Sequence, residues 1–275
     1  MLELVTDPKT SAAKIFCLIA MFAALPAWAD ETPTHIDVGS LPAKDVAGVV
    51  VPVPSEVFGV LDKLGSPNWH EVLRSTKSNA IGERPQVALM LGTVIAEGFI
   101  AVEAQESEEV KKIGSTVLKL AAAIGVQKSV IARSNSIREW ADKKDWTRVR
   151  SELDGALQDV KQAMHELGDE QLAQLVSLGG WLRGTEALTS IVAKNYSRDG
   201  AELLHQPLLL DYFQKRLDTM EKRLKNNSVV TKIHKRLAEI RPLVANGNAQ
   251  ISAKSVDQIH EITQDLVKSV SAKES

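Results

Sequence analysis

One stretch limits what this chain can fold into: residues 86–104, QVALMLGTVIAEGFIAVEA, are apolar on almost every face and carry an isolated carboxylate, Glu97, near the middle. A helix of this kind is either the central helix of a larger protein or a membrane span. The run has about the 20 residues that a bilayer requires. However, a carboxylate at mid-helix costs roughly 2.5–3.5 kcal/mol on insertion. The sequence therefore favours a buried central helix, with membrane association through residues 86–104 as the alternative.

A second apolar helix is predicted at residues 172–196, and it contains three glycines. Each glycine inside a helix costs about 1 kcal/mol relative to alanine, so their presence suggests a close approach of two backbones. Gly180 and Gly184 have the spacing at which small residues let helices touch, and Gly92 and Ala96 repeat it on the first helix. We therefore expect the two apolar helices to cross in contact.

The rest of the chain predicts amphipathic helices. Their apolar residues recur at steps of three and four, as expected when one face of a helix is buried. Aromatic residues make up only 4% of the chain, which is low for a β-sandwich core. The fold class is therefore all-α, an antiparallel helical array around two apolar central helices with a C-terminal helical bundle. The predicted amphipathic helices are 107–125, 128–143, 145–167, 210–224, 233–244 and 256–270, with shorter ones at 55–64 and 68–75.

Composition divides the chain into four parts. Residues 1–29 have the pattern of a signal peptide, and residues 30–54 are rich in proline and valine, which favours an extended arm or linker. Residues 55–196 form the expected helical core domain. Residues 197–275 form the C-terminal helical bundle, either packed on the core or continuous with it.

The signal peptide is predicted from its three regions. Lys9 and Lys14 precede an apolar run at residues 15–25, and small residues, Ala27 and Ala29, stand at the two positions that a signal peptidase reads. We expect cleavage after Ala29 and export to a bacterial periplasm.

The single cysteine, Cys17, lies inside that peptide, so the mature chain would have no thiol. This excludes disulfides, thiolate catalysis and cysteine-ligated zinc. Export without disulfides is consistent with a periplasmic protein that has a sizeable core.

Charge and motifs exclude further classes. The formal charge is −2 and acidic and basic residues read as interleaved, so we expect no nucleic-acid partner, which would require a basic stripe. The six histidines do not form a metal-binding spacing on any helix, and no serine-nucleophile turn or nucleotide motif occurs. We therefore predict no catalytic residue, no metal and no cofactor.

The candidate site lies between the two apolar helices, around Glu97 and Arg183. One interpretation is a buried salt bridge that sets the register of the helices, because an unpaired buried ion costs several kcal/mol. The other is a polar pocket in which Arg183 grips an anionic ligand and Glu97 a hydroxyl or a cation. The residues assigned to such a pocket are Thr93, Glu97, Trp181, Arg183, Glu186, Ser190 and Lys194.

These patterns indicate an exported, non-catalytic binding or interaction module. It would bind a small molecule near Glu97 and Arg183 or a protein partner through its charged C-terminal helices, which could also associate with a second copy. The alternatives are an enzyme with a polar pocket around Glu97 and Arg183, and a membrane-associated helical protein. A dry contact between Glu97 and Arg183 would favour a structural role, and a solvent-reachable Arg183 would favour ligand binding.

The signal peptide gives a direct test. The chain expressed with its native N-terminus in a bacterium should be recovered from the periplasm beginning at Asp30, as intact-mass measurement would show. Replacing Ala29 with arginine should leave the leader attached, because the peptidase accepts small residues there. A periplasmic chain that still begins at Met1 would contradict the prediction.

Overall fold

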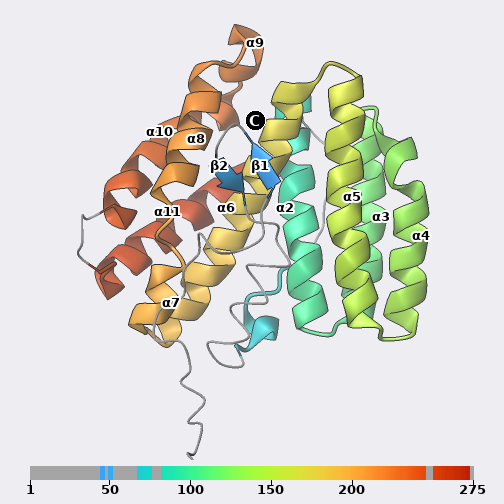
Figure 1. Cartoon of the computed structure of the whole chain (residues 1–275), viewed down its shortest axis with the longest axis horizontal. Coiled ribbons are helices and arrows are strands. Elements are labelled where there is room, and N and C mark those ends of the chain that lie inside the picture. Colours follow the sequence, from blue (N-terminus) through green and yellow to red (C-terminus); the bar gives the residue numbers. More distant parts are fainter. Residues whose placement is uncertain (1–43, 47–48, 52–66, 76–81, 246–249, 273–275) are drawn as a thin grey trace, which may run out of the picture. The chain divides into compact units, whose positions relative to one another are not determined.

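The computed structural model describes residues 44–46, 49–51, 67–75, 82–245 and 250–272, and these are overwhelmingly helical (Figure 1). Residues 35–275 form one compact unit, and residues 1–34 are a separate one that lies outside the described residues. The predicted all-α class is confirmed. The signal peptide and the helix predicted at 55–64 fall outside the described residues and stay predictions.

The long helices follow the apolar periodicity of the sequence closely. They are α2 (Arg84–Glu103), α3 (Ser107–Ala123), α4 (Gln127–Asp142), α5 (Trp146–Glu166), α6 (Glu170–Lys194), α8 (Pro207–Asp218), α10 (Ser228–Val244) and α11 (Ala253–Ser271). Short helices α7 (Arg198–Glu202) and α9 (Lys222–Lys225) lie in the connections of the C-terminal part.

Helices α2 and α6 lie at the centre of the array. Helices α3, α4 and α5 pack on the α2 side, and α11, α10 and α8 follow one another on the α6 side (Figure 1). Helix α2 is long and apolar enough to cross a membrane, but its apolar window is entirely buried by the surrounding helices. Protein rather than lipid therefore covers this face in the folded unit, as the buried-helix interpretation requires.

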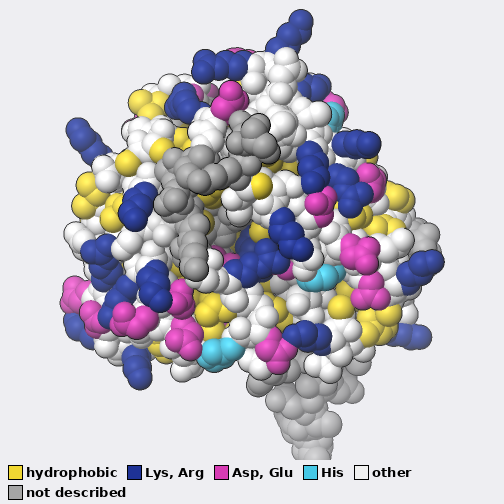
Figure 2. All heavy atoms as spheres, turned by 180° about the vertical axis from the view of Figure 1, so that it is seen from behind, with side chains coloured by type: hydrophobic (Ala, Val, Ile, Leu, Met, Phe, Trp, Pro, Cys, Tyr) yellow, Lys and Arg dark blue, Asp and Glu magenta, His cyan; other side chains and the backbone are white. Residues whose placement is uncertain are grey.

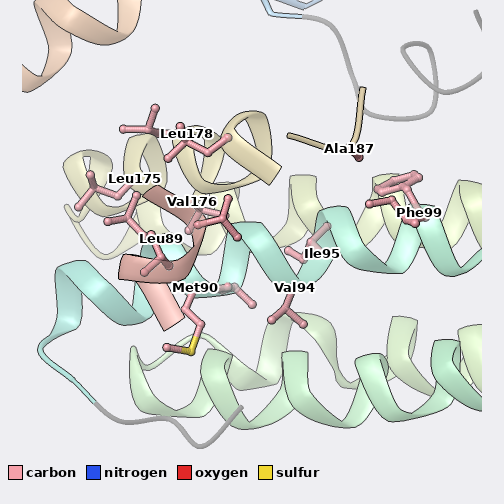
Figure 3. Packing of buried hydrophobic residues seen from close by; sticks show 14 of the residues in the cluster. Leu89, Met90, Val94, Ile95, Phe99, Leu175, Val176, Leu178 and Ala187 are labelled. Atoms are coloured by element: carbon pink, nitrogen blue, oxygen red, sulfur yellow. The ribbon is translucent and has the colours of Figure 1, made fainter. Parts of the chain in front are cut away.

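The core of the unit includes the α2–α6 contact. Leu89 and Ile95 of α2 are 0% and 2% exposed, and Leu175 and Val176 of α6 are 0% exposed. Figure 3 shows these side chains between the two helices. Their burial supplies apolar area at about 25 cal/mol per Å², the main favourable term in folding.

The crossing depends on two glycines. A Cβ atom added to Gly92 would lie 1.9 Å from the carbonyl oxygen of Val176, and one added to Gly179 would lie 2.0 Å from that of Leu89. The helices therefore touch backbone to backbone, as the glycine content predicted. The prediction that Gly184 also lets the two helices touch was wrong, because a Cβ atom added there would meet no other atom within 4 Å.

Three details differ from the sequence-based expectations. The helix predicted at 68–75 is a single 3₁₀ turn, Trp69–Glu71, followed by irregular chain. The helix predicted at 210–224 ends at Asp218, and α9 is a separate turn after it. The predicted arm contains two short antiparallel strands, β1 (Lys44–Val46) and β2 (Val49–Val51).

The glycine contact predicts opposite effects at two positions in the interior of helices. Gly92→Ala should lower the free energy of unfolding by about 1–3 kcal/mol, because the new methyl group overlaps the Val176 carbonyl. At Gly184 a new methyl group would enter open space. Gly184→Ala should therefore leave the free energy of unfolding unchanged or raise it by up to about 1 kcal/mol, because alanine has the higher helix propensity. Urea denaturation of both variants tests this. Equal stability of the two would contradict the close crossing.

Candidate functional site

A buried ion pair joins the two central helices. The Nε atom of Arg183 on α6 donates a hydrogen bond of 2.6 Å to Oε2 of Glu97 on α2. The two residues are 1% and 3% exposed, so the contact is dry. By the criterion set from the sequence, this geometry favours a structural role for the pair over a pocket in which Arg183 grips an anion.

The remaining donors of Arg183 are also engaged. Its Nη1 donates to Oε2 of Glu186, one turn further along α6, at 2.6 Å. Its Nη2 donates to the backbone carbonyl of Val72 at 2.5 Å. Every guanidinium nitrogen of Arg183 therefore has a partner from its own chain, which is what a buried arginine requires.

The segment 67–75, called the strap below, completes the cluster with a second arginine. The backbone N–H of Arg74 donates to Oε1 of Glu97 at 2.5 Å, and its Nη2 donates to Oε1 of Glu186 at 2.5 Å. Each carboxylate thus bridges Arg74 and Arg183, and two positive charges balance two negative ones. This cluster of Arg74, Glu97, Arg183 and Glu186 is called the ionic centre below.

Sequence reasoning found three of the four members and missed Arg74. Glu97, Arg183 and Glu186 are conspicuous because they interrupt apolar helices. Arg74 lies in a polar stretch where arginine usually faces solvent, and its side chain is in fact 34% exposed. No periodic pattern connects residue 74 to residues about 23 and 112 positions away. This contact is therefore a product of tertiary folding alone.

Two other predicted site residues are absent from the ionic centre. Thr93 donates to the carbonyl of Met90 in its own helix at 2.8 Å. Trp181, which the sequence also assigned to a pocket around Glu97 and Arg183, makes its contacts elsewhere. Its Nε1 donates to Oε1 of Gln206 at 3.1 Å and its ring lies 5.6 Å from that of Phe213, so it faces α8.

The last two predicted residues lie near the end of α6. Ser190 is half-buried, and Lys194 is exposed. Lys194 forms an ion pair with Glu71 of the strap. The hydrogen bond from Lys194, together with one from Asn68, lowers the pKa of the Glu71 carboxyl. Lys194 therefore ties the strap to α6 from outside and is not a ligand group of the ionic centre.

The structure places two hollows elsewhere among the described residues. A cavity of about 10 Å³ lies beside Trp181 and Leu210, which is room for about one water molecule. A depression of about 570 Å³ lies where α2 and α6 begin, and Arg84, Asp169 and Arg223 are among its lining residues. Neither hollow is lined by Glu97 or Arg183. The described residues include no group of three His, Cys, Asp or Glu side chains placed to hold a metal ion.

Positive charge is concentrated on one part of the C-terminal helices, contrary to the interleaved charge inferred from the whole chain. Residues 207–244 contain nine Lys and Arg against four Asp and Glu, a formal +5, while the chain as a whole carries −2. Figure 2 shows Lys and Arg side chains over much of this face of the molecule, including its top, the end at which Figure 1 places α9.

Several of these cations have no ion pair among the described residues. They are exposed and come from three successive helices, so we define the α8–α10 surface by them: Lys215, Lys222, Arg223 and Lys235. By contrast, Arg241 on the same helices is paired with Asp211 at 2.6 and 2.9 Å. Arg223 also lines the depression, so the positive surface and the depression adjoin.

The ionic centre predicts a large stability loss. Glu97→Ala or Arg183→Ala alone should lower the free energy of unfolding by about 3–5 kcal/mol, because each leaves an uncompensated buried charge. Lys143→Ala, which removes an exposed pair with Glu139, should cost less than about 1 kcal/mol and is the control. Denaturant titrations give all three values. A loss below about 1 kcal/mol in both buried variants would rule out the dry pair.

Comparison of the chain with protein-family models, with curated proteins and with solved structures finds no match in any of the three.

Proposed function

We propose that this chain is an exported, non-catalytic interaction module that binds an acidic protein partner through its α8–α10 surface. The observation that carries the proposal is the separation of charge. Residues 207–244 carry a formal +5 in a chain whose total is −2, and the cations that define the surface are exposed. A field of one sign steers an oppositely charged partner and raises the association rate.

The rest of the molecule supports a binding role over a catalytic one. The most unusual polar residues, Glu97, Arg183 and Glu186, have their charges satisfied within the fold. A catalytic acid or base needs access to a substrate proton, within hydrogen-bond reach or through one water. The hollows described above are lined by neither Glu97 nor Arg183. The cations of the α8–α10 surface are exposed and have no ion pair among the described residues, so they remain free to contact a partner.

The depression beside Arg223 gives the positively charged surface a concave neighbour that a partner could enter. It is lined mainly by polar groups from the starts of α2 and α6 and from the turn before α9. A volume of about 570 Å³ is enough for one or two side chains of a partner to enter. Glu83, Asp169, Glu170 and Glu221 also line it, so the partner contact would combine positive and negative groups. Such mixed rims give specificity more than affinity.

The test uses the intact protein purified from the periplasm without detergent. Native mass spectrometry at about 0.05 M and again at about 0.5 M salt should show a co-purifying protein that is lost at the higher salt, because exposed charges are screened there. The affinity of the identified partner is then measured for the wild type and two charge-reversed variants.

The expected result is selective. Lys222→Glu with Arg223→Glu should weaken binding roughly 10- to 100-fold, since each reversal removes an attraction and adds a repulsion. Lys119→Glu with Lys128→Glu makes the same charge change at exposed positions of α3 and α4 and should bind as the wild type does. An equal loss of affinity in the two double variants would contradict the proposal. So would a chain that co-purifies with no partner at low salt. Binding to anionic vesicles in place of a protein would contradict the proposed protein partner.

A further inference from the structure

We propose that the ionic centre is a binding site for small guanidinium compounds, and that the Arg74 side chain of the strap occupies it as an internal competitor. This inference concerns a different part of the molecule from the α8–α10 surface and does not depend on the proposed partner. The two arginines that share Glu97 and Glu186 differ in their burial and in their number of partners.

The first step is the difference in burial. Arg183 projects from the interior of a 25-residue helix, has a side chain 1% exposed and donates to three separate acceptors. The Arg74 side chain is 34% exposed and forms one ion pair among the described residues, from Nη2 to Oε1 of Glu186. Releasing Arg183 would break the core, whereas the Arg74 guanidinium can rotate into solvent. Of the two cations, Arg74 is therefore the exchangeable one.

The strap can stay in place when the Arg74 side chain moves away. Trp69 and Val72 are 5% and 7% exposed, so they anchor the strap in the core. The contact to Glu97 is made by the backbone N–H of Arg74 and not by its side chain. Moving the Arg74 side chain away leaves these anchors intact. The opening would then expose the outer oxygen of Glu186, whose side chain is 5% exposed.

The position that the Arg74 guanidinium vacates is negatively charged. With Arg74 in place, the centre is neutral. Once the guanidinium has left, Glu97 and Glu186 face Arg183 alone, and the centre has a net charge of −1. The complementary ligand is thus a cation held by a carboxylate, and not an anion gripped by Arg183. A planar guanidinium matches carboxylate geometry better than an ammonium, which acts as a point charge.

Competition by Arg74 lowers the apparent affinity of any ligand in the wild type. Only the fraction of molecules with the Arg74 side chain displaced can bind, so the apparent dissociation constant is the intrinsic one divided by that fraction. Removing the internal competitor should therefore tighten binding. A purely structural role of Arg74 would not produce this tightening.

The full exported chain is titrated with methylguanidinium and, in a separate experiment, with methylammonium. Isothermal titration calorimetry measures the binding in both titrations. Arg74→Ala should bind one methylguanidinium at least about tenfold more tightly than the wild type. It should also prefer methylguanidinium to methylammonium. Adding Glu186→Gln to Arg74→Ala should abolish the saturable binding, because the carboxylate that holds the ligand is gone. Arg84→Ala removes an arginine from the more exposed pair with Asp169 and should bind no better than the wild type.

Circular dichroism establishes that each variant is folded. If Arg74→Ala fails to fold, Arg74→Gln removes the charge with less loss of packing and is titrated in its place. A folded Arg74 variant without saturable binding would overturn the inference. So would equal affinities in the wild type and the Arg74 variant, or an equal gain in Arg84→Ala, which would show only a general effect of deleting an arginine.

Discussion

The architecture depends on the burial of one arginine. Taking the guanidinium of Arg183 out of water costs several kcal/mol, and this cost is offset only when its donors find acceptors in good geometry. Here Glu97 comes from α2, Glu186 from α6 itself and the Val72 carbonyl from the strap. A shift of α6 along α2 would separate Arg183 from Glu97. The ionic centre therefore penalises alternative registers more strongly than apolar packing can, because apolar contacts are not directional.

The glycine contact and the ionic centre both stabilise the contact between α2 and α6. Backbone contact at Gly92 and Gly179 holds the helices close at one end of the crossing. The paired residues Glu97 and Arg183 follow a little further along the same two helices. A close approach near the ion pair excludes water from it, and exclusion of water strengthens the electrostatic contact. Packing and electrostatics thus support each other at the α2–α6 contact.

The distribution of charge separates the stability of this fold from its capacity to bind. The charges within the core are neutralised by one another, and the exposed excess of positive charge is confined largely to α8, α9 and α10. Charge that is already paired in a dry core cannot attract a partner at long range, whereas exposed and unpaired charge can. The surface of the C-terminal helices is therefore the part of the molecule for which we propose a role in recognition. Arg74, with a side chain 34% exposed, is the member of the ionic centre that reaches solvent.

Sequence alone determined the helical class, most helix boundaries and the closeness of α2 and α6, because these follow from apolar periodicity and from the cost of glycine inside a helix. It also singled out Glu97 and Arg183, since isolated charges on apolar helices require partners. Only the tertiary structure decided that Gly179 rather than Gly184 makes the contact, that Trp181 faces α8 and that Arg74 joins the cluster. The physical reason is that local patterns specify which face of a helix is buried, but not which distant backbone or side chain will meet it. Those contacts depend on how the helices cross and on where an irregular segment such as the strap is laid across them.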